Sequence, residues 1–477
     1  MKEFFKILKT TVLLVLIIVS LNTCKEKETK SFVNLSSIEK IKKRGKLIAV
    51  MDFNSTNYFI YRGEPMGYQY ELLQLLAKEL DVKLEVKVEN NVDENFNMLN
   101  KDECDIIAIN LTITKERAKK IDFTYPHSQT RQVLVQRKPE NWKNIKKVRI
   151  EKNVIRNQLD LAGKVIYVQK GTSYAERMKN LSDEIGDSII IIEKGDKEVE
   201  ELIELVANGE IDYTVVDENV ALVNQIYHPN LDVKTAVSFP QNMAWGLKKG
   251  DASLKMEIDK WLINFKKTAH YNIIYNKYFK NPRSVRIVES DYYSNSSGKV
   301  SQYDEYIKKY SKEIDWDWRL LASLVYQESR FKHNAKSWAG AYGLMQLMPT
   351  TARRFGVNKN SSAEMQIKAG VDFIKWLEKR FDIRGITDEE EQIKFVLASY
   401  NVGLGHILDA RRLAEKNGMN PDVWQDNVDE YILKKSNPKY YKDPVVKYGY
   451  CRGSETYNYV YQILDRYEHY KNIIPET

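Results

Sequence analysis

Apolar and polar positions alternate in two ways along the chain, and the first way fills its N-terminal half. From residue 45 the strand-like run KLIAVMD is followed by the amphipathic run YELLQLLAKEL and then by KLEVKVE. After Pro139 the alternation restarts with KVIYVQKGTSYAE, SIIIIEK and EVEELIELVANGEIDYTVVDENVALV. Strand-like runs that alternate with amphipathic helices predict α/β lobes.

We predict two such lobes over residues 45–284, with a cleft between them. The second lobe is expected to be inserted into the first at about residues 139–240, because the chain returns through AWGL to helices that end near residue 279. The connecting strands are expected at roughly 133–138 and 236–247.

The second half of the chain has the periodicity of helices. Amphipathic runs at 302–312, 316–329, 362–380 and 388–400 are separated by Gly and Pro. The Ser- and Asn-containing stretch at 285–300 is a linker by composition. We therefore predict an all-α domain over residues 301–477.

The N-terminus has the pattern of an export signal. Basic residues precede an apolar run at 12–19 that is too short to span a bilayer but typical of a signal peptide, predicted over residues 1–23. Leu21, three residues before Cys24, resembles a bacterial lipoprotein cleavage box, which implies acylation of Cys24 and a tether over 24–44. We expect a lipid-anchored envelope protein on the periplasmic face of the outer membrane. The alternative is an ordinary signal peptide with an incidental cysteine.

Composition narrows the possible partners. The net charge is +8, which suits anionic envelope polymers and is equally explained by a Lys-rich surface. The six histidines and three cysteines are scattered, so we expect no metal, no cofactor and no disulfide framework. No nucleic-acid-binding motif is present, and we expect no nucleic-acid partner.

One carboxylate stands out in the helical half. Glu328 falls seven residues after Leu321 and four after Leu324, so it shares their helix face. Desolvation raises the pKa of a carboxylic acid, as a general acid requires. The alternative is a Glu at the end of a helix that reaches water.

The residues that follow Glu328 belong to a composite motif. The run E-S-x(7)-S-x(2)-G-A-x-G-L-M-Q-x-M-P-x-T-A, with ASYNVG at 398–403 and SETYNYVYQIL at 454–464, resembles the lytic transglycosylase domain of the soluble-lysozyme-like type. The resemblance implies a lysozyme-like α fold of the goose type. It also implies contacts to the sugar from Ser337, Gln346, Met348, Tyr400, Asn401, Glu455 and Tyr459.

Within this resemblance each residue has an expected role. Ser337 and Gln346 hydrogen-bond the sugar and its N-acetyl group, and Met348 packs against the ring. Tyr400 orients Glu328, or is simple core packing. Asn401 positions a strand or loop at the site. Glu455 corresponds to an outer carboxylate and Tyr459 to its neighbour, although a structural salt bridge explains Glu455 equally well.

The resemblance implies a peptidoglycan lytic exotransglycosylase, a lyase that cleaves the MurNAc-GlcNAc β-1,4 bond and leaves 1,6-anhydroMurNAc ends. A hydrolytic glycosidase ordinarily uses two carboxylates. Glu364, Asp372, Glu378 and the run 388–391 have the pattern of solvated helix faces or loops. One acid/base suffices if the C6 hydroxyl of the muramic acid is the nucleophile.

The α/β half resembles family-3 extracellular solute-binding proteins, which are periplasmic-binding-protein-like modules. The motifs are GYQYELLQLLAKEL, DIIAINLTITKERAKKIDFTYP, GTSYAE and GEIDYTVVDENVAL. In this family Arg117 corresponds to the residue that holds a ligand carboxylate, Thr112 and Thr172 to further contacts on that group, and Asp217 to the partner of the ligand ammonium. A surface role for Arg117 and a helix cap for Asp217 are the alternatives.

The two domains in this order resemble the membrane-bound lytic murein transglycosylase F group. That resemblance implies a muropeptide or amino-acid-like ligand that regulates cleavage. Two alternatives stay open. One is a non-enzymatic envelope receptor or wall-binding scaffold, and the other is an enzyme that hydrolyses the glycan as lysozyme does.

Overall fold

The computed structural model describes residues 35–279, 298–382, 385–474 and 476. The predicted signal peptide, Cys24 and most of the linker lie outside the described residues. Within the described segments, no helix is both long enough and apolar enough to cross a membrane.

The first lobe is a mixed sheet covered by helices. Its strands run in the order β4-β1-β5-β13-β6, with β7 beside β13, and β13 is antiparallel to β5. The strands are β1 (Lys46–Met51), β4 (Lys83–Val88), β5 (Ile106–Thr112), β6 (Ile121–Phe123), β7 (Ser128–Thr130) and β13 (Gln241–Lys248). The helices are α2 (Ser37–Arg44), α3 (Tyr68–Glu79), α4 (Val92–Asn100), α5 (Lys115–Lys120), α10 (Ala252–Phe265) and α11 (Ala269–Phe279).

The second lobe has its own sheet, in the order β10-β9-β11-β8-β12. Its strands are β8 (Gln132–Arg137), β9 (Val165–Gln169), β10 (Ile190–Lys194), β11 (Tyr213–Asp217) and β12 (Leu231–Ala236). The helices are α6 (Lys147–Asn153), α7 (Ser173–Ile185), α8 (Val199–Asn208) and α9 (Glu218–Tyr227). Since β8 already belongs to this sheet, the chain enters the second lobe at residue 132 rather than at about 139.

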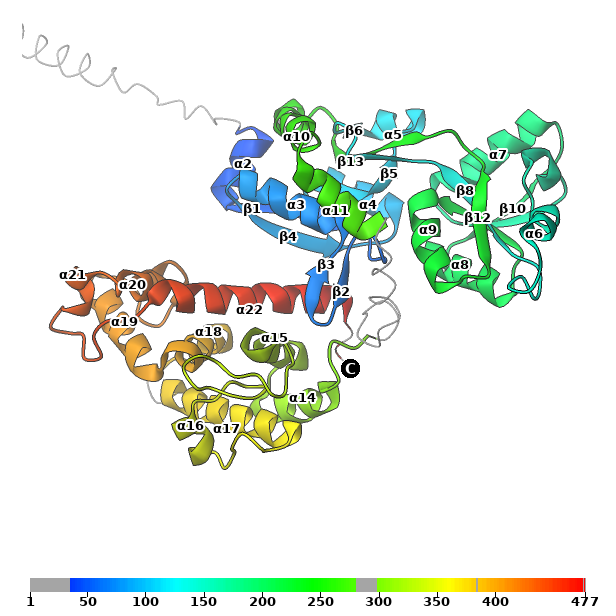
Figure 1. The fold of residues 1–477 in the computed structure, drawn as a ribbon. Helices are drawn as coiled ribbons and strands as arrows, with labels where there is room; N and C mark the ends of the chain where they lie inside the picture. The colour runs from blue at the N-terminus through cyan, green and yellow to red at the C-terminus, as the bar shows by residue number, and fades with distance from the viewer. Residues whose placement is uncertain (1–34, 280–297, 383–384, 475, 477) are drawn as a thin grey trace, which may run out of the picture.

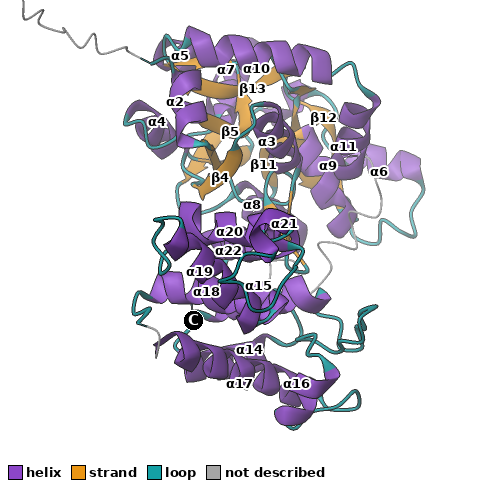
Figure 2. Ribbon diagram, turned by 90° about the vertical axis from the view of Figure 1, so that its left-hand side faces the viewer, coloured by secondary structure: helices purple, strands orange, loops and turns teal. Residues whose placement is uncertain are grey.

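The C-terminal domain is helical, as the periodicity predicted (Figures 1 and 2). Its α-helices are α14 (Asp304–Ser311), α15 (Trp318–Ser329), α16 (Pro349–Arg354), α17 (Ala363–Asp382), α18 (Glu389–Val402), α19 (Leu404–Lys416), α20 (Asp429–Lys434), α21 (Pro438–Tyr441) and α22 (Gly453–Ile473). The predicted multidomain architecture, a two-lobed α/β module followed by an all-α domain, is confirmed.

A β-hairpin joins the two halves. Strands β2 (Phe59–Tyr61) and β3 (Glu64–Met66) project from the first lobe onto α22 (Figure 1). Ile60 is buried in the same core cluster as the residues of α15 and α22. At the hairpin tip, the hydroxyl of Tyr470 donates to the carbonyl oxygen of Gly63 at 2.7 Å. The α/β module and the helical domain are therefore packed together rather than only tethered.

Candidate active site and ligand cleft

Helix α15 places Glu328 at the edge of the helical core. The helix is capped by Asp317, whose side chain accepts from the backbone N–H of Arg319 at 2.8 Å. Leu321 and Leu324 are fully buried on the face that Glu328 shares. The helix ends one residue after Glu328, and the side chain of Glu328 is half-buried.

The surroundings of Glu328 hold its pKa near neutrality. Burial raises the pKa of Glu328 to about 7, and a hydrogen bond from the hydroxyl of Tyr459 on α22 acts in the opposite direction. Burial also raises the pKa of Tyr459, so its hydroxyl stays protonated and donates. Near pH 7 the carboxyl group can therefore both give and take a proton, as a general acid/base must.

Tyr400 lies beside this carboxylate but does not make the expected bond. Its hydroxyl donates to the carbonyl oxygen of Met345 at 2.8 Å, while the hydroxyl bonded to Glu328 belongs to Tyr459. Burial raises the pKa of Tyr400 and the nearby charge of Glu328 raises it further, so the two side chains are close. Tyr400 thus joins α18 to the loop, Tyr459 is hydrogen-bonded to Glu328, and the predicted role of Tyr400 in orienting Glu328 stays a prediction.

Internal hydrogen bonds fix the loop between α15 and α16. Gln346 has a φ of 43°, and its Nε2 donates to the carbonyl oxygens of Gly343 at 2.8 Å and Ala335 at 3.1 Å. The Oγ of Ser337 accepts from the backbone N–H of Ala341 at 3.0 Å. Their predicted contacts to a sugar, and that of the exposed Met348, stay predictions.

The remaining predicted residues lie where α18 and α22 meet. The hydroxyl of Thr456 donates to Asn401 Oδ1 at 2.8 Å, which joins the end of α18 to the start of α22. Glu455 is exposed in the first turn of α22, four residues before Tyr459 and on the same helix face. Its predicted role as an outer carboxylate of the site stays a prediction.

Glu378 is a second carboxylate with a raised pKa. Burial raises its pKa to about 7, and its carboxylate accepts from Trp316 Nε1 at 2.8 Å. The prediction of a solvated helix face was wrong for this residue. Trp316 precedes the start of α15, so Glu378 lies on the order of 15 Å from Glu328, at the other end of that helix. This exceeds the separation at which two carboxylates share one glycosidic bond.

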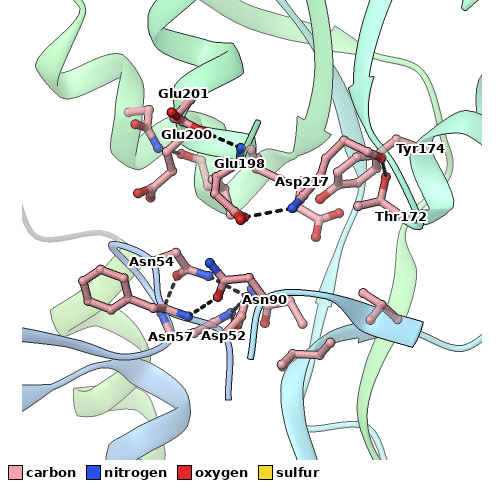
Figure 3. A pocket seen from close by; sticks show the side chains of 18 of the residues that line it. Asp52, Asn54, Asn57, Asn90, Thr172, Tyr174, Glu198, Glu200, Glu201 and Asp217 are labelled. Atoms are coloured by element: carbon pink, nitrogen blue, oxygen red, sulfur yellow. Dashed lines mark hydrogen bonds between the residues drawn. The ribbon is translucent and has the colours of Figure 1, made fainter. Parts of the chain in front are cut away.

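The four residues predicted to bind a ligand line one cavity of about 530 Å³ between the two lobes. Figure 3 shows the polar side chains that face one another across this cleft, from both lobes. Thr112 and Arg117 come from the first lobe, and Thr172 and Asp217 from the second. The lobes touch through Ser173 Oγ, which lies 3.4 Å from Thr112 Oγ1.

Asp217 is buried at the end of β11 with an unsatisfied oxygen. None of the described residues donates a hydrogen bond to its Oδ1. Burial raises the pKa of Asp217 to about 7, whereas a hydrogen bond with Tyr174 and the charge of Arg117 lower it. Arg117 is held by a bond from Nη1 to the carbonyl oxygen of Thr112 at 3.2 Å. The cleft therefore holds a carboxylate with a free oxygen, Asp217, together with the guanidinium of Arg117.

Sequence reasoning missed several polar residues of the cleft. Asp52 follows β1 directly, accepts from Asn57 Nδ2 at 2.8 Å and Asn54 Nδ2 at 2.6 Å, and has a pKa that burial raises to about 7. Glu200 on α8 accepts from the backbone N–H of Ser55 at 3.0 Å across the cleft. Asp52 could have been found by its place at the carboxyl end of a strand, whereas the Glu200 contact depends on how the lobes close.

Comparison with known proteins matches the α/β module and the helical domain to two separate families. Residues 47–281 match the family model of bacterial extracellular solute-binding proteins, family 3, and residues 305–422 match the transglycosylase SLT domain. A solved ancestral arginine-binding protein bound to arginine is 26% identical with a TM-score of 0.42, covering 50% of this chain and 99% of its own.

Two curated relatives match across both parts. Membrane-bound lytic murein transglycosylase F of Desulfosudis oleivorans is 33% identical over 436 residues, which is 91% of this chain and 92% of the relative. The protein of the same name from Saccharophagus degradans is 33% identical over 430 residues, covering 90% of this chain and 82% of the relative. The chain belongs to the membrane-bound lytic murein transglycosylase F family.

Proposed function

We propose that this lytic murein transglycosylase uses Glu328 as its single general acid/base and leaves 1,6-anhydroMurNAc ends. The observation that carries the proposal is the half-buried carboxylate of Glu328, with a pKa raised to about 7 and a hydrogen bond from Tyr459. A group that changes protonation near neutral pH can act first as acid and then as base.

The two proton transfers balance without a second carboxylate. The protonated Glu328 gives its proton to the glycosidic oxygen as the bond from this oxygen to C1 of the muramic acid breaks. The resulting carboxylate takes the proton of the C6 hydroxyl while O6 bonds to C1 and closes the anhydro ring. The N-acetyl group of the same sugar stabilises the cationic C1 between the two steps. Glu328 ends protonated, ready for the next bond.

Digestion of purified peptidoglycan tests this proposal. Wild type and Glu328→Gln are incubated with sacculi, and the new glycan ends are identified by mass spectrometry. We expect anhydro-muramyl ends from wild type alone. Ordinary reducing ends would mean hydrolysis, and the absence of products with and without added muropeptides would favour a wall-binding scaffold.

We further propose that the cleft binds a muropeptide or amino-acid-like ligand that regulates cleavage. The buried Asp217 with a free Oδ1 suits a ligand ammonium, and the guanidinium of Arg117 suits a carboxylate. An unpaired buried oxygen costs free energy that an incoming donor would recover. Arg117→Ala is expected to abolish the thermal stabilisation caused by muropeptides, and an unchanged melting shift would contradict the assignment.

One stretch of chain, residues 52–66, offers a route from cleft to active site. Asp52, at the start of this stretch, lines the cleft. Tyr58 contacts the helical domain, because its hydroxyl lies 2.6 Å from Nδ1 of His469 on α22. The same helix carries Tyr459, ten residues earlier and about 15 Å away along its axis. A shift of this stretch on ligand closure would therefore act on the partner of Glu328.

Membrane attachment through Cys24 is a separate proposal. The short apolar run before Cys24 and the box from Leu21 to Cys24 support it. Acyl chains would hold the protein at the envelope without a spanning helix. Cys24→Ala is expected to release the protein from membranes, and continued membrane association would contradict acylation at this residue.

A further inference from the structure

Trp338 is the most exposed large apolar side chain among the described residues. Its indole is 100% exposed, whereas every other tryptophan of the chain lies in a described segment and is buried or half-buried. An indole in water forgoes the gain of burying a large apolar surface. Trp is enriched at interfaces, so a fully exposed indole is available for contact with a ligand or partner.

The turn that carries Trp338 is internally bonded. The backbone N–H of Ser337 donates to the carbonyl oxygen of Ala341 at 2.9 Å, and that of Gly340 donates to the carbonyl oxygen of Ser337 at 3.1 Å. Gly340 has a φ of +94°, which favours glycine at this position. Because the turn is fixed before binding, little backbone entropy is lost when a ligand covers the indole.

This turn lies close to Met348, a predicted sugar contact. Antiparallel bridges pair Lys336 with Tyr342 and Tyr342 with Leu347, so Ala341 lies between Ser337 and Met348 in one row across three short segments. Neighbouring segments of such a row are about 4.8 Å apart. Trp338 follows Ser337 directly, so its backbone lies within about three such spacings of Met348.

The loop is also joined to the catalytic carboxylate. The hydroxyl of Tyr400 donates to Met345 at 2.8 Å, and the charge of Glu328 contributes to the raised pKa of Tyr400. A chain of contacts therefore leads from Glu328 through Tyr400 to the loop that carries Trp338.

We propose that Trp338 is a glycan-binding residue that stacks on a sugar ring of the strand next to the cleaved bond. This inference rests on the proposed function, because the occupant is the strand that Glu328 cleaves. A pyranose ring presents C–H groups on one face and hydroxyl groups at its edge, so it packs against a flat indole while its hydroxyls stay in water. The contact adds dispersion and apolar burial without requiring a buried polar group.

The turn suits a sugar better than a bilayer. A membrane-binding surface needs several apolar side chains together with basic ones. Here the neighbours of Trp338 are Ser337, Ala339 and Gly340, so the indole is the single large apolar group of the turn. One flat ring on a polar turn matches one sugar ring.

Binding to purified sacculi, measured by co-sedimentation in a Glu328→Gln background that leaves the glycan intact, tests the proposal. Adding Trp338→Ala is expected to weaken binding about tenfold, and Trp338→Phe, which keeps an aromatic face, by no more than about threefold. Phe239→Ala is the matched control, since Phe239 is an 89% exposed aromatic side chain of the α/β module, and it is expected to change nothing.

Sacculus binding by Trp338→Ala equal to that of its parent would overturn the role of Trp338. If this variant also lost binding to anionic phospholipid vesicles, the indole would be a membrane contact instead. If the loss of binding occurs but wild type releases no anhydro ends, Trp338 keeps its role and the proposed chemistry fails.

Discussion

Glu328 and Asp217 are two carboxylates with similarly raised pKa values in different architectures. Burial raises the pKa of each to about 7, and each is hydrogen-bonded to a tyrosine, Tyr459 for Glu328 and Tyr174 for Asp217. Glu328 lies on helices of a single packed core, whereas Asp217 lies where two lobes meet and faces the guanidinium of Arg117 across a cavity.

This difference separates a proton-transfer group from a ligand-pairing group. A carboxylate without a nearby cation can hold a proton at neutral pH and release it to a substrate. One with a cation across a closing cleft is suited to pairing with the ammonium of a zwitterionic ligand. A raised pKa alone therefore does not identify a catalyst, and the surroundings decide the role.

The largest expected effect separates Glu328 from another carboxylate of equal pKa. Glu328→Gln is expected to lower the rate of release of soluble glycan from sacculi by about 10³-fold, the scale of a lost general acid/base. Glu378→Gln, at a carboxyl whose pKa burial also raises to about 7, is the matched control and is expected to change the rate less than twofold. A loss of comparable size in both variants would contradict the assignment.

The next effect concerns Asp217. Asp217→Asn keeps the shape but removes the charge that pairs with a ligand ammonium, so we expect about 100-fold weaker muropeptide binding in a thermal-shift titration. Asp212→Asn, at an exposed residue bonded to Arg137, serves as the control. Equal affinities of the two variants would show that the charge of Asp217 does not pair with a ligand ammonium.

A smaller effect is expected at Tyr459. Its hydrogen bond to the Glu328 carboxylate lowers the pKa, so Tyr459→Phe should raise this pKa further. Because the first step needs the protonated acid, activity falls as pH rises through the pKa, and the basic limb of the pH-rate profile should move to higher pH. We expect about a tenfold lower rate at the optimum. An unmoved limb would mean that the bond does not act on the reacting group.

The smallest effect tests the connection between the two regions. At Gly63 a Cβ would lie 2.7 Å from Tyr326, Phe331 and the hydroxyl of Tyr470, whereas at Gly163 it would meet nothing within 4 Å. Both glycines have positive φ, so both Ala variants carry the same backbone strain of about 1 kcal/mol. Gly63→Ala is expected to lose about 1–2 kcal/mol more in unfolding and to weaken the response of cleavage to muropeptides. Equal losses would mean that the hairpin tip adapts.

Most of the fold could be predicted from the local pattern of apolar and polar residues. The strand and helix periodicities located both lobes and the helical domain, and the spacing of Glu328 from Leu321 and Leu324 placed it on a buried face. The hydrogen bond between Tyr459 and Glu328 could not be predicted, because the two residues are 131 positions apart. They lie on helices whose packing angle no local pattern encodes. The same holds for Ser55 and Glu200, which meet only when the lobes close.

The hairpin at 59–66 illustrates another limit of sequence reasoning. Its aromatic Phe59 packs in the first lobe, but Ile60 is buried in the core of the helical domain, more than two hundred residues later in the chain. Glu378 was misassigned for a related reason, since its periodicity placed it on an outer face that Trp316 covers. Tertiary contacts of this kind override the local signal.

Digestion of sacculi by wild type in water enriched in oxygen-18 tests the central claim most directly. If the C6 hydroxyl of the muramic acid is the nucleophile, Glu328 needs no water, and the released muramyl ends should be anhydro sugars without oxygen-18. Muramyl ends that are two mass units heavier than their unlabelled reducing counterparts would show that water attacks C1. That result would contradict the single acid/base mechanism and require a second group to activate the water.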